Sequence, residues 1–166
     1  MRVIQRCTIL VTVAMAGLAT VAAPAAAASA PGPLRAPTSC IRVSATIHVG
    51  RSPVGVAANR KTNTVYVANG GSKTVAVISG RTNTVTATIP VAAPPGPGLA
   101  ANPKTKTIYV GHPDLVSVIS GRTNTVTATI PVGSFPGGVA VNRKTNTAYV
   151  TNQASNTVSV LTSCRR

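Results

Sequence analysis

The chain has 166 residues, a formal net charge of +15 and a single acidic residue, Asp114. Because glutamate is absent, one chain cannot assemble the pair of carboxylates that glycoside or acid-protease chemistry needs. Aromatic residues make up only 2% of the chain and no zinc-finger, helix-turn-helix or RNA-binding signature is found, which argues against nucleic acid as a partner.

Residues 1–30 have the layout of a secretory signal peptide. Arg2 and Arg6 form a basic start, residues 7–22 are uncharged and apolar, and small residues at 26–30 fit a cleavage site. We therefore expect a secreted, extracellular protein with no membrane span once the signal is removed, and its charge suits association with the cell wall. A retained membrane anchor is the alternative, although the apolar run is shorter than a typical span of ~20 residues.

A proline-rich linker is predicted at residues 31–39, before a repeat domain at residues 40–166. Residues 77–91 recur letter for letter at residues 118–132, 41 positions further along the chain. A period of this length is typical of β-propeller and solenoid arrays. The three predicted units comprise residues 49–90, 91–131 and 132–164.

Each unit contains short β-type runs rich in Val, Thr, Ile and Tyr and separated by Asn, Gly, Ser, Lys and Pro. In the first unit these runs are residues 55–59, 64–69, 74–79 and 84–91. No helical period is found after residue 30. Four antiparallel strands per repeat is the organisation of a propeller blade, so the predicted fold class is all-β, with three four-stranded antiparallel blades.

In the second predicted strand of the units, residues 66–69 read YVAN and residues 149–152 read YVTN, whereas the middle unit has Tyr109-Val110-Gly111-His112. These strands resemble the YVTN-type β-propeller repeats of secreted and surface-layer-like proteins. The resemblance implies a propeller fold, and complete members of the family close a ring of more than three blades. It implies little about activity, because propellers carry many unrelated functions.

The two ends of the repeat domain together supply one blade. Residues 40–49 match residues 82–91, which form the fourth strand of a unit, and the last unit stops after its third strand. We therefore predict that residues 40–48 complete the last blade. Cys40 and Cys164 then lie at neighbouring positions across the junction, and a disulfide between them is expected in a secreted protein.

Three blades are fewer than the about four that the smallest ordinary rings contain. We therefore expect a two-fold homodimer through exchanged strands, with six blades, in which the first strand of each chain completes the last blade of its partner. An intramolecular bridge in a distorted or open three-blade array is the alternative.

Basic residues are predicted to gather on one side of the array, because the first and third turns of an up-and-down blade lie on the same side. The predicted anion-binding face comprises Arg60, Lys61, Arg81, Lys104, Lys106, Arg122, Arg143 and Lys144. The opposite rim carries Arg51, Lys73 and Asp114. Such a face favours an anionic cell-wall polymer or a protein partner. A surface that is merely kept solvated by its charge is the alternative.

Candidate groups for chemistry are few. His48 occupies the frame of Pro90 and Pro131 and is most simply a strand-end residue. His112 and Asp114 share a predicted turn, but two possible ligands make an incomplete metal site. Serine and threonine are abundant without a recognisable His and Asp constellation, so no catalytic, metal or cofactor site is expected.

The sequence thus favours a non-catalytic binding or scaffold protein of the cell envelope. Two alternatives remain open at this point. One is a cofactor- or metal-carrying propeller enzyme subunit, and the other is a truncated relic of a longer propeller.

Overall fold

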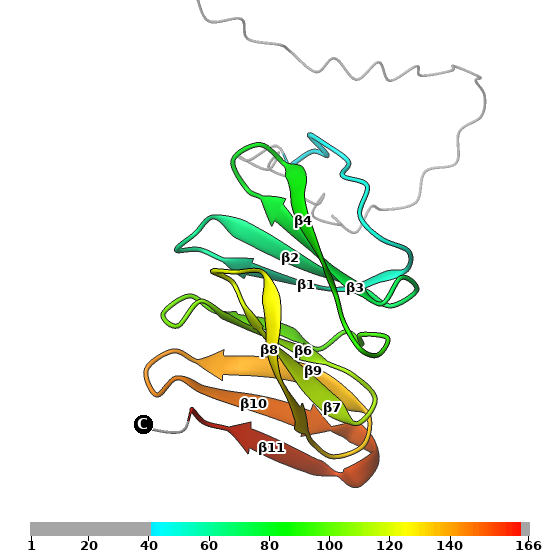
Figure 1. The fold of residues 1–166 in the computed structure, drawn as a ribbon, viewed down its shortest axis with the longest axis vertical. Coiled ribbons are helices and arrows are strands. Elements are labelled where there is room, and N and C mark those ends of the chain that lie inside the picture. Colours follow the sequence, from blue (N-terminus) through cyan, green and yellow to red (C-terminus); the bar gives the residue numbers. More distant parts are fainter. Residues whose placement is uncertain (1–40, 164–166) are drawn as a thin grey trace, which may run out of the picture. The chain divides into compact units, whose positions relative to one another are not determined.

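Residues 41–163 are described by a computed structural model, in which the chain forms three antiparallel sheets (Figure 1). We name these sheets blade 1 (β1–β4), blade 2 (β5–β8) and blade 3 (β9–β11). The strands are β1 (Pro53–Asn59), β2 (Thr64–Asn69), β3 (Thr74–Ser79), β4 (Thr84–Pro90), β5 (Leu99–Asn102), β6 (Thr107–Gly111), β7 (Leu115–Ser120), β8 (Thr125–Pro131), β9 (Pro136–Asn142), β10 (Thr147–Asn152) and β11 (Thr157–Leu161). Within the described range, one short 3-10 helix, Gln153–Ser155, is the sole helical element. The predicted all-β fold of propeller-type blades is confirmed.

Neighbouring strands in each blade are also neighbours in the chain, so every connection within a blade is a hairpin. The outer pairs β3–β4 and β7–β8 contain the same irregularity, a register shift opposite Thr86 and Thr127. At this bulge the Thr86 hydroxyl donates to the Val77 carbonyl (3.2 Å) and the Thr127 hydroxyl donates to the Val118 carbonyl (3.0 Å). The repeat in sequence is therefore a repeat in hydrogen bonding as well.

The hairpin turns depend on residues that accept left-handed backbone. Asn63, Asn83, Asn124 and Asn146 all have a positive φ, between 49° and 57°. Asparagine tolerates this region better than most residues with a Cβ. Lys106 takes the same conformation, with φ at 59°, in the frame where the other two units have asparagine.

Adjacent blades meet through their first strands, since β5 contacts both β1 and β9. Glycine makes this approach possible: a Cβ on Gly55 would lie 2.7 Å from the Pro97 carbonyl oxygen and 3.4 Å from Leu99 Cβ. One blade further on, a Cβ on Gly98 would lie 3.1 Å from Val139 Cγ2. Blades 2 and 3 therefore each place an apolar side chain against a glycine of the blade before them.

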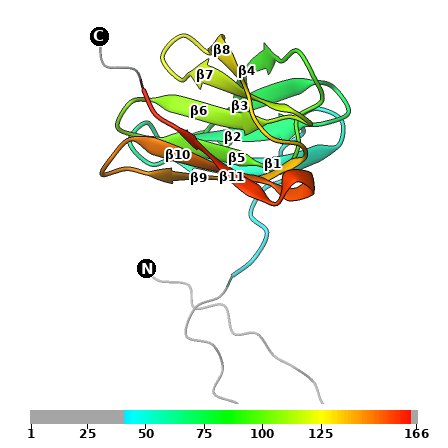
Figure 2. The same cartoon turned by 90° about the horizontal axis from the view of Figure 1, so that it is seen from below.

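The main core lies between blades 1 and 2. It contains Tyr66, Ala68, Val75, Val77, Ile89, Val91, Leu99, Ile108, Val110 and Ile119. Tyr66 and Ile108 are among the largest side chains that are fully buried. Two apolar sheet faces thus cover one another, as in the stacked blades of a propeller (Figure 2).

Blade 3 has three strands, in the order β11-β10-β9, and β11 has no strand on its outer side within the described chain. Residues 40–48 were predicted to supply the fourth strand of this blade, and the described part of this segment, residues 41–48, forms no strand in the single chain. The prediction that they complete the last blade therefore depends on a pairing that the single chain does not contain.

Several predictions from the sequence concern residues outside the described range. The signal peptide at residues 1–30, the linker at residues 31–39, and both Cys40 and Cys164 lie there. The disulfide therefore stays a prediction. Among the described residues, no helix is long and apolar enough to cross a membrane.

Substitution Gly55→Ala tests the contact between blades. The new methyl group would meet the Pro97 backbone at 2.7 Å, which no rotation of a side chain can relieve. We expect a loss of about 1–3 kcal/mol in the free energy of unfolding, measured by urea denaturation. Gly137→Ala is the control, because its methyl group would meet nothing closer than 3.7 Å. Equal effects of the two substitutions would contradict the proposed packing.

Candidate functional site

The first turn of each blade is fixed by an asparagine. The side-chain oxygens of Asn59, Asn102 and Asn142 accept hydrogen bonds from the backbone N–H two residues later, at 3.1, 3.0 and 3.0 Å. In each case the donor is a lysine: Lys61, Lys104 and Lys144. Such Asx turns fix the local backbone, so each lysine emerges from an ordered position.

The third turns of blades 1 and 2 are fixed by a serine in an equivalent way. Ser79 Oγ accepts from the backbone N–H of Arg81 at 3.3 Å, and Ser120 Oγ accepts from that of Arg122 at 3.3 Å. Both arginine side chains are exposed. The identical geometry follows from the identical sequence of these two turns.

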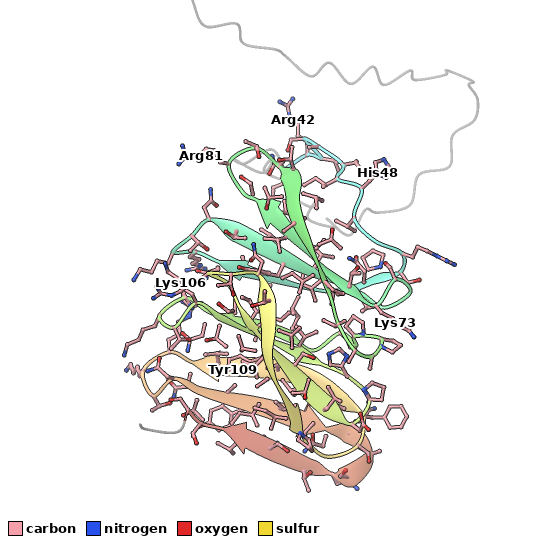
Figure 3. All side chains as sticks on the ribbon, viewed as in Figure 1. Arg42, His48, Lys73, Arg81, Lys106 and Tyr109 are labelled. Carbon is pink, nitrogen blue, oxygen red and sulfur yellow. The ribbon has the colours of Figure 1, made fainter. Side chains whose placement is uncertain are left out.

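Backbone hydrogen bonds join the first turn to the third turn within blade 1 and within blade 2. Gly80 donates to the Asn63 carbonyl at 2.8 Å, and Gly121 donates to the Lys106 carbonyl at 2.7 Å. Between blades 2 and 3, Asn102 Nδ2 lies 3.4 Å from Asn146 Oδ1. Figure 3 shows Arg81 and Lys106 on the same side of the array, with Lys73 on the other.

We call this surface the turn face. It carries all the residues predicted to bind anions: Arg60, Lys61, Arg81, Lys104, Lys106, Arg122, Arg143 and Lys144. Each of them is exposed except Lys106, which is partly buried. Asp114 lies in the turn between β6 and β7, on the opposite side. No carboxylate within residues 41–163 therefore offsets the positive charge of the turn face.

A polar hollow of about 170 Å³ opens between the turns of blades 1 and 2. Its walls carry hydroxyl and amide groups, and Tyr66 contributes to its lining. The residues around it are Thr62, Asn63, Thr64, Tyr66, Val77, Ser79, Thr86, Gly121 and Asn124. Arg81 and Arg122 each follow closely in sequence on a residue of this lining. The hollow was not predicted from the sequence, because it lies between two repeats rather than within one.

A larger and more apolar cavity, of about 290 Å³, lies among the second turns of blades 2 and 3 and the two links that join blade 1 to blade 2 and blade 2 to blade 3. Prolines dominate its lining, together with Phe135 and His112. The full set is Pro94, Pro95, Gly96, Pro97, His112, Pro113, Phe135, Pro136, Gly137 and Gln153. Few polar groups converge there.

His112 is the buried polar residue of that cavity, and its Nε2 lies 2.8 Å from Ser117 Oγ. The pair resembles a nucleophile and its base, but Ser117 is fully buried and out of reach of a substrate. In blade 3 the equivalent bond joins Asn152 Nδ2 to Ser159 Oγ, at 2.9 Å. His112 therefore replaces a structural asparagine that locks the second strand to the third. The sequence carried the signal for this role, since His112 occupies the frame of Asn69 and Asn152.

The remaining candidates do not come together. His48 is exposed at the far end of blade 1, close to Ser72 and Thr88. Within residues 41–163, no three His, Cys, Asp or Glu side chains gather as a metal centre requires.

His112 predicts a pH dependence of stability. Burial lowers its pKa below the ordinary value, although the carbonyls of Pro94 and Ala93 and the charge of Asp114 act in the opposite direction. The unfolded chain therefore binds a proton more readily than the folded chain, so stability that is present above the unfolded pKa is lost as pH falls. We expect the unfolding midpoint in urea to decrease between about pH 7.5 and 5.

His112→Asn is the matched test, because asparagine occupies this frame in the other two blades. The variant should keep the bond to Ser117 and lose most of the pH dependence in that range. If wild type and variant show the same pH profile, the assignment of the titration to His112 is wrong.

Comparison with known proteins shows that the fold of this chain is similar to parts of several solved structures. No protein-family model matches the sequence, and no curated protein matches it. Among solved structures, hydrazine synthase of Kuenenia stuttgartiensis matches 69% of this chain at 24% identity with a TM-score of 0.58, over 33% of its own chain. The β-propeller domain of Cps50 (Swd1) from Myceliophteria thermophila matches 65% of this chain at 13% identity with a TM-score of 0.56, over 35% of its own chain.

A third structure, dihydro-heme d1 dehydrogenase NirN in complex with DHE, matches 61% of this chain at 20% identity with a TM-score of 0.53. The chain covers 22% of that protein, so in all three cases it spans about a third or less of the matched chain. At these identities the likeness concerns the fold alone. The chain has the architecture of consecutive propeller blades, similar to part of these larger proteins.

Proposed function

We propose that the protein is a secreted, non-catalytic binding or scaffold protein of the cell envelope, and that its turn face engages an anionic wall polymer. The observation that carries the proposal is the fusion of basic turns into one surface. The bonds from Gly80 to Asn63 and from Gly121 to Lys106 hold the arginine-bearing third turns against the lysine-bearing first turns.

The electrostatics of this face favour an extended anion over a small one. Charges of one sign on a surface raise the local concentration of a polyanion, and release of its counterions adds to the affinity. Turns from all three blades contribute cations, so the face can follow several repeating units of a polymer. Its charge is not offset locally, because Asp114 lies on the opposite rim.

The polar hollow adds a feature that charge alone does not supply. Hydroxyl and amide groups of Thr62, Asn63 and Asn124 line it, beside the exposed Arg81 and Arg122. Such groups donate and accept hydrogen bonds to sugar hydroxyls and to phosphate or sulfate oxygens. The hollow therefore fits one polar unit of a chain whose neighbouring anionic groups contact the arginines.

The test removes two positive charges either from the turn face or from the opposite rim and compares the effects on binding to a polyanion. We expect Arg81→Gln combined with Arg122→Gln to lower the salt concentration that elutes the protein from immobilised heparin, an anionic polysaccharide. The plot of log affinity against log salt should also become shallower, because fewer cations neutralise the polymer and fewer counterions are released.

The control pair is Arg51→Gln with Lys73→Gln, which removes the same charge from the opposite rim. Circular dichroism at the working temperature checks that both variants are folded. A position-specific effect supports binding at the turn face. Equal effects of the two pairs would show that only net charge matters and would overturn the proposed site.

A further inference from the structure

We propose that two copies of this chain close a six-bladed ring, in which residues 41–49 of each copy form the fourth strand of the other copy's blade 3. The inference rests on the edges of the array and is independent of what the turn face binds. The proposed ring covers two surfaces that are open in the single chain. One is the outer edge of β11, and the other is the face of blade 1 that points away from blade 2.

Blade 3 is open both on one face and at one edge. On the face that points away from blade 2, Val158 is 55% exposed and Val160 is 56% exposed, whereas Val75 and Val77, in the same frame of blade 1 and packed against blade 2, are 0% and 3% exposed. The outer edge of β11 has no strand partner within the described chain. An open strand edge is a template for another strand, and an uncovered apolar face is where a further blade would pack.

Residues 41–49 have the sequence of the missing strand. They occupy the frame of residues 83–91, which include β4, and Val43 falls on the position of Val85. Ser44 falls on the position of Thr86, the residue whose hydroxyl bonds to a carbonyl at the bulge. In the single chain this segment forms no strand and leaves Val43 86% exposed.

The register of the joint follows from blade 1. There, Val75 lies opposite Ile89, Val77 opposite Ala87, and Ile78 opposite Val85. Carried over to the joint, the equivalent pairs are Val158 with Ile47, Val160 with Ala45, and Leu161 with Val43. The Ser44 hydroxyl then lies where it can donate to the Val160 carbonyl, as Thr86 donates to Val77.

The contact between a glycine of one blade and an apolar side chain of the next also has two unpaired partners, one in blade 3 and one in blade 1. Leu99 packs on Gly55 and Val139 packs on Gly98, so each blade offers a glycine to the next. In blade 3 the equivalent glycine is Gly138, and a Cβ placed on it would meet only Thr151 of its own blade. In blade 1 the equivalent apolar side chain is Val56, which is 68% exposed. Val56 of one copy therefore fits Gly138 of the other.

A second copy is favoured over closure within one chain. Figure 1 shows residues 42–49 beside blade 1 at one end of the array and β11 at the other, with blade 2 between them. Two copies give a ring of six blades, within the range of about 4–8 that propellers adopt, and three copies exceed it. If the two-fold axis coincides with the central axis of the ring, the turn faces of both copies lie on the same side, and the basic surface is doubled.

The first experiment measures mass in solution by light scattering, with reductant present so that no disulfide contributes. We expect twice the mass of one chain. Ile47→Asp should raise the dissociation constant of the dimer by at least about tenfold, because Ile89, in the same frame of the complete blade 1, is only 2% exposed and a carboxylate there would be buried in each joint. Val43→Asp is the matched control in the same segment, since Val85, in its frame, is 38% exposed, and it should weaken the dimer far less.

The second experiment fixes the register. Ala45→Cys combined with Val160→Cys, in a background with Cys40→Ser and Cys164→Ser, should yield a covalent dimer on a non-reducing gel after mild oxidation. Ala45→Cys combined with Val158→Cys is the off-register control and should cross-link far less. A folded monomer in the first experiment, or a cross-link confined to single chains in the second, would overturn the proposal.

Discussion

The structure depends on one repeated contact, in which a side chain from the first strand of a blade rests on a glycine of the preceding blade. Leu99 on Gly55 and Val139 on Gly98 are the two examples within the described chain. A Cβ on Gly55 would lie 2.7 Å from the Pro97 carbonyl oxygen and 3.4 Å from Leu99 Cβ, and a Cβ on Gly98 would lie 3.1 Å from Val139 Cγ2, so the spacing between blades is set there. At that spacing, the apolar side chains of blades 1 and 2 pack against one another and form the core. It also leaves Val56 and Gly138 as the two unused halves of the same contact.

The stacking has a direct consequence for the surface. Since every connection within a blade is a hairpin, stacked blades align their first and third turns on one side and their second turns on the other. Lysines and arginines in those turns then accumulate without any contact between them. Hydrogen bonds from the Asx turns and the serine-capped turns fix the backbone from which these basic side chains extend. The single acidic residue, Asp114, lies on the opposite rim. The turn face is therefore a product of topology and composition together.

Much of this organisation could be predicted from the sequence, because the repeat is nearly identical and its frame transfers from unit to unit. The strands predicted at residues 64–69 and 74–79 agree with β2 and β3. The polar hollow and the bond between His112 and Ser117 were not predicted, since both require contacts that periodicity does not specify. The segment at residues 41–49 shows the limit most clearly. Its strand frame is evident in the sequence, yet within the described chain it forms no strand and pairs with none.

Amide hydrogen exchange of the purified protein tests the central claim most directly, because it reports the two open edges at once. If two copies close a ring, the amides of residues 42–49 and of the outer side of β11 should exchange as slowly as those of β4 and β3 in blade 1, and dilution should speed up both segments together. Exchange of residues 42–49 as fast as that of the exposed hairpin turns, at every protein concentration, would contradict the account.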